Sequence, residues 1–167
     1  MDDSARKVEI GVAHKDSGNA LFVRGDYTGA LREYHLAVLH LSGLDRRAVD
    51  ALAGGGAPSA EPAGSAQLAL VRANMAACYL RVARYDRAVQ SAEQALALEP
   101  TNQKAIFRKA QALRLQGELH AAREFLTQSH ARAYAEHPDF VAEATRISTE
   151  IRAREQKSAA ALRGFLR

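Results

Sequence analysis

Cysteine and long apolar runs are both scarce in this sequence, which limits where the protein can reside. Cys78 is the only cysteine, so it cannot form an internal disulfide, and its apolar helical surroundings suit a reducing compartment. No run of 18 apolar residues occurs, and the charged start MDDSARKVEI lacks the apolar core of a signal peptide. We therefore expect a soluble, cytoplasmic protein that does not associate with a membrane.

Signals for β-structure are missing as well. Val, Ile and Tyr show no alternation of period two, and the sequence contains only four prolines. Alanine, leucine, glutamate, arginine and glutamine, which favour helices, dominate the composition. The fold class predicted from these absences is all-α.

Charge is unevenly distributed along the chain. The formal net charge is +4, whereas residues 103–167 alone hold 12 Lys/Arg against 7 Asp/Glu. This excess indicates that an acidic partner meets the second half of the chain.

A helix–turn–helix pattern recurs three times. Its complete form spans residues 69–102, with small or aromatic residues where two helices would touch and a proline at the end. These residues are Ala76, Tyr79, Tyr85, Ala88, Ala95 and Pro100. Stepping 34 residues forward from Ala76, Tyr79, Ala83, Tyr85 and Ala88 gives, in that order, Ala110, Leu113, Gly117, Leu119 and Ala122. An earlier copy contains Gly18, Leu21, Gly25, Tyr27, Ala30, Tyr34 and Ala37.

This pattern resembles the tetratricopeptide repeat, and the resemblance implies an α-solenoid of stacked helix pairs. We expect a single domain over residues 4–166, since three repeats are about the minimum for a stable stack. Its parts are repeat one (11–44), an insertion (45–68), repeat two (69–102), repeat three (103–136) and a capping helix (139–165).

The insertion and the last helix carry their own signals. Three consecutive glycines and two prolines predict a flexible insertion, mostly a loop over residues 45–64, although 46–52 could extend the preceding helix.

In the last helix, apolar or small residues recur at three- and four-residue steps, with Arg154 interrupting them. They are Phe140, Ala144, Ile147, Ile151, Ser158, Leu162 and Phe165. This helix is expected to cap the stack, or alternatively to offer its far end, with Leu162, Phe165 and Leu166, to a partner.

Polar residues lie on the first helix of each pair, which is the helix that lines the concave groove of such a stack. Lys15 and Asn19 are four residues apart in repeat one, Asn74 lies in repeat two, and Lys104 and Arg108 are four apart in repeat three. Residues at this spacing share a helix face, and two cations at i, i+4 repel each other unless an anion lies between them. The groove is therefore predicted to bind an anionic ligand.

These five residues match the two-carboxylate clamp of co-chaperone tetratricopeptide proteins, which the groove therefore resembles. The resemblance implies that Lys15, Asn19, Asn74 and Lys104 hold the terminal carboxylate and last side chain of an extended peptide. It also implies that Arg108 takes a carboxylate or carbonyl further upstream. Phe22, one turn beyond Asn19, would contact the valine of the peptide. The implied partner is the acidic EEVD-type C-terminus of heat-shock protein 90 or 70, bound by a monomer, and the choice between the two chaperones stays open.

A closer resemblance covers nearly the whole chain outside the insertion. The phrase EYHLAVLHLSGLD at 33–45, the long insertion and a terminal helix ending near Gly164 and Phe165 are similar to the tetratricopeptide repeat protein nine family. The chain also resembles the repeat domain of large immunophilins, without the isomerase domain.

Catalysis has little support in the sequence. The histidines form no HExxH pair, Cys78 lacks a nearby basic partner, and the glycines at 54–56 follow no strand and precede no Lys-Ser/Thr. The basic C-terminal third lacks interleaved aromatic residues for nucleic-acid binding. We expect a non-catalytic adaptor without metal or cofactor. The alternative is a scaffold that binds a helical or cytoskeletal partner through the terminal helix or the convex face.

Overall fold

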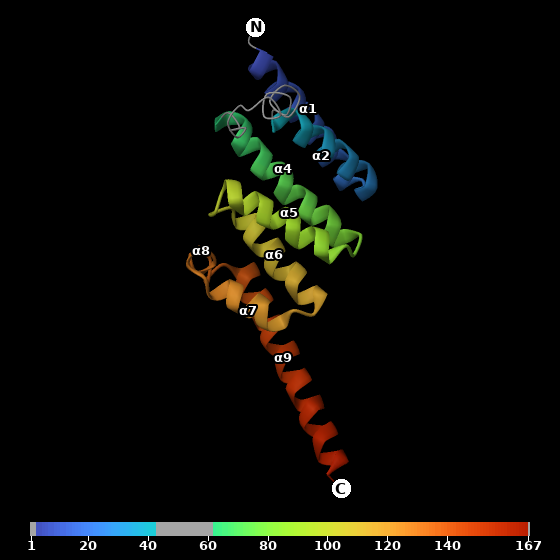
Figure 1. Cartoon of the computed structure of the whole chain (residues 1–167), viewed down its shortest axis with the longest axis vertical. Helices are drawn as coiled ribbons and strands as arrows, with labels where there is room; N and C mark the ends of the chain where they lie inside the picture. The colour runs from blue at the N-terminus through green and yellow to red at the C-terminus, as the bar shows by residue number, and fades with distance from the viewer. Residues whose placement is uncertain (1–2, 43–61, 167) are drawn as a thin grey trace, which may run out of the picture.

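The computed structural model of the protein describes residues 3–42 and 62–166. All regular structure within these ranges is helical, in the order α1 (Asp3–Val23), α2 (Tyr27–Leu41), α4 (Pro62–Arg81), α5 (Tyr85–Leu98), α6 (Gln103–Gln116), α7 (Leu119–Thr127), α8 (Ser129–Arg132) and α9 (Pro138–Phe165). Neighbouring helices pack in sequence from α1 to α7 and then onto α9, which produces an elongated stack (Figure 1). The prediction of an all-α solenoid with a terminal capping helix is confirmed.

Each of the three helix pairs has an equivalent turn between its two helices. Gly25 and Gly117 adopt φ values of +81° and +92°, and Ala83 occupies the same place with φ of +57°. In each turn the next backbone N–H donates to a carbonyl five residues back, as from Asp26 to Leu21 at 3.0 Å. A left-handed residue at this point ends a helix and reverses the chain. The turn that the sequence predicts at Gly25 is thus repeated twice.

Small residues lie where the paired helices touch. The alanines fully excluded from solvent include Ala30, Ala37, Ala76, Ala88, Ala95, Ala110 and Ala122. Gly18 allows an even closer approach, because a Cβ atom there would lie 2.5 Å from the ring of Tyr34. Such contacts let the helix axes come close together, as the sequence pattern indicates.

The start of α4 differs from the expectation. The flexible insertion was expected to reach residue 68, but residues 62–68 belong to α4. Pro62 suits the first position of a helix, since its φ is already helical and it has no N–H to satisfy. Leu68 is 7% exposed and packs in the core cluster that includes Leu41, so burial stabilises this added turn. Residues 45–61, including the possible extension at 46–52, lie outside the described residues.

The second helix of repeat three is shorter than the sequence suggests. Gln128 has an extended backbone, with φ of −69° and ψ of 155°, and separates α7 from the short α8. Asn102 begins α6, because its side chain accepts a hydrogen bond from the N–H of Ala105 at 2.9 Å.

The buried residues of the capping helix α9 lie in its first half, and Arg154 in the second half reaches back to donate a hydrogen bond to the carbonyl oxygen of Gly117 at 2.9 Å. Phe140, Ile147 and Ile151 are buried as predicted, but Ala144 is exposed and the fully buried neighbour is Glu143. Arg114 of α6 explains the difference, because its Nε donates to Oε1 of Glu143 at 2.5 Å. A buried carboxylate with such a partner replaces an apolar contact in the predicted stripe.

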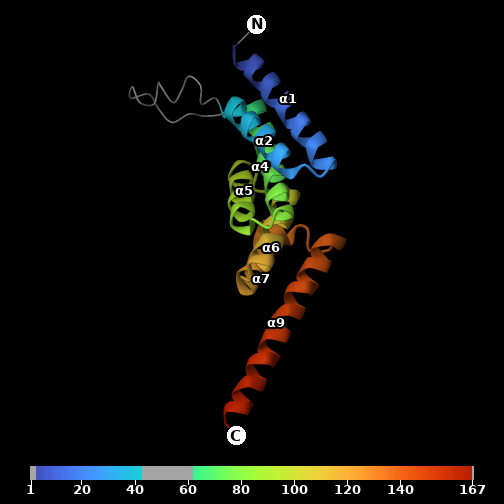
Figure 2. The ribbon, with the colours of Figure 1, turned by 90° about the vertical axis from the view of Figure 1, so that its right-hand side faces the viewer.

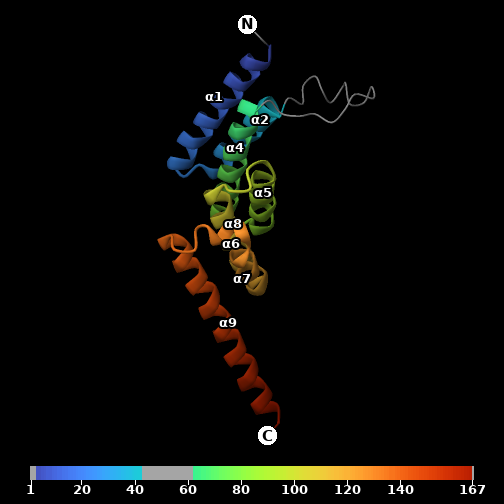
Figure 3. The same cartoon turned by 90° about the vertical axis from the view of Figure 1, so that its left-hand side faces the viewer.

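The far half of α9 leaves the stack. It continues past α7 in each of the three views (Figures 1, 2 and 3). Among the residues that the structure describes, no helix is long and apolar enough to cross a membrane.

Candidate functional site

A cavity of about 260 Å³ opens between the first helices of the three pairs. Its lining comes from α1, α2, α4 and α6 and comprises Asn19, Phe22, Val23, Tyr34, Asn74, Ala77, Lys104 and Arg108. Five of the six residues proposed from the sequence therefore surround one space. Lys15 is the exception, and its position is described below.

Two hydrogen bonds fix the side chain of Asn19. Its Oδ1 accepts from the hydroxyl of Tyr34 at 2.7 Å and from Nδ2 of Asn74 at 2.9 Å. Within the described part of the chain its Nδ2 has no hydrogen-bond partner, so the amide presents a donor for a ligand. The hydrogen bond from Asn74 joins α4 to α1 across the cavity.

Tyr34 is a site residue that the sequence reasoning treated only as packing. It is 1% exposed, and burial raises the pKa of its hydroxyl to about 12, so the group stays a neutral donor to Asn19. A buried tyrosine hydroxyl needs a partner, and this requirement is the signal by which the sequence could have indicated a polar neighbour for Tyr34.

Arg108 links two groove helices. Its guanidinium donates to the carbonyl oxygen of Ala73 at 2.6 Å and to Oδ1 of Asn74 at 3.4 Å. Burial lowers the pKa of Arg108 from its ordinary value, but a guanidinium remains charged at neutral pH. A positive charge is therefore held at the floor of the site.

Lys104 lies one turn before Arg108 on α6 and is exposed. Among the described residues it has no ion pair or hydrogen bond, although it lines two adjoining cavities. An ammonium group in this situation can gain a charge-assisted hydrogen bond without losing an internal one.

Lys15 reaches a different partner. Its Nζ donates to Oε1 of Gln67 at 2.9 Å and lies 3.5 Å from Oδ1 of Asp16. Gln67 stands seven residues before Asn74 on α4, so both point from the same face of that helix. The sequence reasoning did not identify Gln67, because its role depends on a neighbour 52 residues away.

A second cavity of about 620 Å³ extends the groove toward α9. It shares Phe22, Ala77, Lys104 and Arg108 with the first cavity and adds Leu80, Arg81, Gln103, Phe107, Gln111, Leu115, His137, Asp139 and Phe140. Figures 2 and 3 show α1 and the start of α9 on the same side of the stack, and the groove runs between them. A groove that reaches from α1 across α4 and α6 to the start of α9 suits an extended segment better than a compact ligand.

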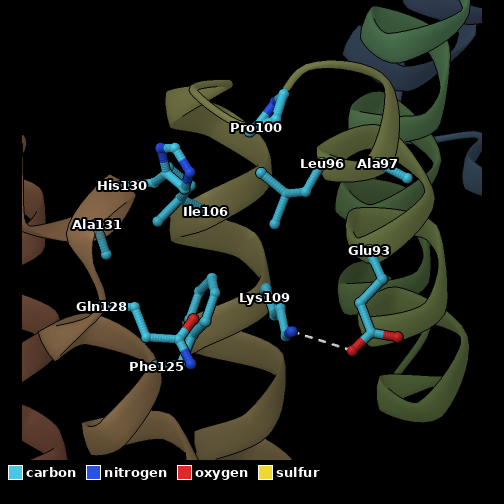
Figure 4. Close-up of a pocket in the computed structure, with 10 residues that line it drawn as sticks. All are labelled: Glu93, Leu96, Ala97, Pro100, Ile106, Lys109, Phe125, Gln128, His130 and Ala131. Carbon is cyan, nitrogen blue, oxygen red and sulfur yellow. Dashed lines mark ion pairs between the residues drawn. The ribbon is translucent and has the colours of Figure 1, made fainter.

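A third cavity, of about 310 Å³, lies on the opposite face of α6 (Figure 4). Its cation is already paired, because Nζ of Lys109 lies 3.0 Å from Oε1 of Glu93 and 4.5 Å from the centre of the Phe125 ring. The rest of the lining is largely apolar and includes Leu96 and Ile106. This pocket is therefore less suited to an anion than the groove.

Cys78 lies behind the groove and is fully buried. Burial raises the pKa of its thiol to about 12, so the reactive thiolate is disfavoured. Within the described ranges no cluster of three or more His, Cys, Asp or Glu residues could hold a metal ion.

Solved structures similar to this chain are tetratricopeptide repeat (TPR) domains. The second TPR domain of human RPAP3, in complex with the HSP70 peptide SGPTIEEVD, is 22% identical and superposes with a TM-score of 0.64 over 87% of this chain and 98% of that one. The C-terminal TPR-containing domain of a putative FK506-binding protein from Plasmodium falciparum is 19% identical, with a TM-score of 0.73 over 93% and 97%. The Hsp90 co-chaperone Cns1 from Saccharomyces cerevisiae is 20% identical, with a TM-score of 0.72 over 98% of this chain and 46% of that one. No model of a known protein family matches the sequence. At these identities the likeness establishes the fold.

Proposed function

We propose that this protein is a non-catalytic adaptor of the co-chaperone type that binds the acidic, EEVD-type C-terminus of heat-shock protein 90 or 70 in its groove. The observation that carries the proposal is the set of donors around the first cavity. Lys104 has no partner among the described residues, Asn19 presents a free N–H donor, and Arg108 adds a buried positive charge. A carboxylate is the ligand that such a set of donors suits.

Charge supports an anionic ligand. Lys104 and Arg108 are four residues apart on α6 and line the same cavity. Their mutual repulsion falls when a carboxylate lies between them, and within residues 3–42 and 62–166 Lys104 has no acidic partner to displace.

The two asparagines support recognition of a chain end. Both amide groups add neutral N–H donors beside the cations, and Oδ1 of Asn74 keeps one lone pair besides its bond from Arg108, so the site can bind carboxylate oxygens and a backbone N–H group. We assign the terminal carboxylate to Asn19, Asn74 and Lys104, and an upstream carboxylate or carbonyl to Arg108. Phe22 supplies an apolar wall for the last side chain.

Lys15 completes the clamp only after it changes partner. Its ammonium group must leave Gln67, which is a neutral acceptor, for the stronger bond to a ligand carboxylate.

Two structural neighbours bear on the choice of ligand. The RPAP3 domain is in complex with an HSP70 peptide that ends in EEVD, and Cns1 is an Hsp90 co-chaperone. Either chaperone tail carries the acidic end that the groove suits, so the choice between them remains open. Charge-assisted contacts of ~1.5–3 kcal/mol each, less an association cost of ~4–15 kcal/mol, lead us to expect about micromolar affinity.

A calorimetric titration tests the proposal. We would titrate a nonapeptide ending in EEVD, once with a free C-terminal carboxylate and once amidated, into the full chain. We expect saturable binding that amidation and Lys15→Ala each weaken by about tenfold or more. Lys104→Glu is expected to abolish it.

The matched control is Arg32→Glu, which makes the same charge change at an exposed site on α2 that lines none of the cavities described above. We expect it to reduce affinity by less than about threefold through screened long-range charge. Equal losses from Lys104→Glu and Arg32→Glu, or no binding of the free peptide at low salt, would overturn the proposal.

A further inference from the structure

The packing face of α9 continues beyond the end of the stack. Ile147 and Ile151 are 1% and 5% exposed, and Ser158, Leu162 and Phe165 follow at steps of seven, four and three residues. Residues at these spacings lie on one side of a helix. Leu162 is 64% exposed and Phe165 is 89% exposed. The helix face that is buried at Ile147 and Ile151 is therefore exposed further along, at Ser158, Leu162 and Phe165, and we call this exposed part the stripe.

A notch lies where this stripe leaves the stack. A cavity of about 420 Å³ separates the start of α7 from α9. It is lined by Leu119 and His120 of α7 and by Ile151, Arg154, Glu155, Ser158, Ala159 and Leu162 of α9. Helices bound the notch on two sides, so a rod-shaped partner can lie in it.

The charges around the stripe have one dominant sign. Every residue from Arg152 to Leu166 is exposed, and this segment contains four cationic residues and a single carboxylate, Glu155. The cations are Arg152, Arg154, Lys157 and Arg163. Two copies of this segment would repel each other, whereas an acidic partner would be attracted.

From these observations we propose that the far half of α9 and the start of α7 form a docking surface for an acidic amphipathic helix of a partner protein. The apolar face of the partner packs into the notch and along Leu162 and Phe165, and its acidic flanks lie near Arg152, Arg154 and Lys157. This surface spans about 21 Å at ~1.5 Å per residue, which a helix of about 16 residues covers. This docking surface shares no residue with the groove. The proposal is therefore independent of whether the groove binds a chaperone tail.

The probe is a designed acidic peptide of about 16 residues with leucines at i, i+3, i+4 and i+7 spacing and glutamates elsewhere. It is acetylated and amidated, so it has no free terminal carboxylate for the groove. Titration into the ¹⁵N-labelled full chain reports both affinity and location. We expect saturable binding with chemical-shift changes at His120, Ser158 and Leu162, and none at Asn74 or Lys104.

The variants separate the stripe from overall charge. The double substitution Leu162→Glu, Phe165→Glu places two carboxylates on the stripe, and Ala153→Glu, Ala160→Glu makes the same charge change on the opposite face of α9. All four positions are exposed, so the fold is preserved. We expect the first pair to weaken binding by tenfold or more and the second pair by about threefold or less.

Four results would overturn the proposal. These are equal losses from both pairs, equal binding of a scrambled peptide without an apolar face, and no binding at low salt. The fourth is association with anionic vesicles, or dimerisation, that Leu162→Glu, Phe165→Glu abolishes, because either would assign the stripe to a membrane or to a second copy.

Discussion

The ammonium group of Lys15 donates to the side-chain oxygen of Gln67 at 2.9 Å and does not line the cavity that the other five proposed site residues share. Gln67 thus holds the one cation of the set that must move before a ligand can use it. This relationship makes Gln67 a determinant of affinity that the clamp pattern by itself does not include.

We predict that Gln67→Glu weakens binding of a free-carboxylate EEVD peptide by about tenfold or more. A carboxylate at this position would pair with Lys15 and repel the ligand, removing about one charge-assisted contact of ~1.5–3 kcal/mol. Calorimetry at low and high salt measures the effect, which should diminish as salt screens the charges. Gln67→Leu, which removes the acceptor without adding charge, should change affinity by less than about threefold. An unchanged affinity for Gln67→Glu would place Lys15 outside the binding site.

The helix pairs could be predicted from sequence because the signals that specify them are local. Gly25, Gly117 and Asn102 act within one turn of their own helices, and the buried alanines recur at fixed spacing. The same spacing predicted that Asn19, Asn74, Lys104 and Arg108 lie together, since equivalent positions of stacked pairs line one groove, and all four line one cavity.

The features that sequence reasoning missed depend on contacts between distant residues. Gln67 accepts from Lys15, 52 positions away, and Asn19 on α1 accepts from Tyr34 on α2. The buried Glu143 accepts from Arg114, 29 positions away. The early start of α4 likewise depends on Leu68 packing near Leu41. Helical periodicity contains no information about such pairs.

A second prediction concerns the packing behind Asn19. Gly18→Ala should destabilise the fold by about 1–3 kcal/mol, because the new Cβ would lie 2.5 Å from the Tyr34 ring and force it to shift. The control is Gly164→Ala, where a Cβ meets nothing within 4 Å and alanine favours the helix. Urea denaturation should show a loss for the first variant and a gain of about 0.5–1 kcal/mol for the second. Equal urea midpoints for wild type and Gly18→Ala would show that α1 and α2 can move apart at this contact without a loss of folding free energy.

The third prediction concerns alkaline pH. Burial raises the pKa of the Cys78 thiol from 9.0 to about 12 and that of the Tyr34 hydroxyl from 10.0 to about 12. Both groups therefore lose protons more readily in the unfolded chain, so their contributions to stability are complete below pH 9 and decline as the pH rises toward 12. For Cys78 the decline is roughly 1.4 kcal/mol per pH unit.

Denaturation of wild type and Cys78→Ala at pH 8, 9 and 10.5 isolates the thiol contribution. The alanine variant should be less stable at pH 8, because a buried side chain is truncated. Its stability should then fall less steeply with pH, by roughly 2 kcal/mol less than wild type between pH 9 and 10.5. Parallel pH profiles for the two proteins would show that the thiol does not control alkaline stability.

The last prediction concerns the attachment of α9. Glu143 is fully buried and accepts from Nε of Arg114 at 2.5 Å and from the guanidinium of Arg146 at 3.1 Å. Burial lowers the pKa of Arg114, but the hydrogen bonds that its guanidinium donates to Glu143 and Glu150 outweigh this effect and raise the pKa, so the guanidinium is charged at every working pH. Glu143→Ala would leave a partly buried cation without its closest partner.

We expect Glu143→Ala to destabilise the fold by about 3 kcal/mol, whereas Glu155→Ala, at an exposed position on the same helix, should change stability by less than about 0.5 kcal/mol. The double variant Arg114→Met, Glu143→Leu should recover most of the loss, because an apolar pair of similar volume avoids the desolvation of both charges. Chemical denaturation measures all three variants. If the double variant proved less stable than Glu143→Ala, Arg114 would contribute mainly through its bond to Glu150 at 2.8 Å, and α9 would be anchored at that exposed pair.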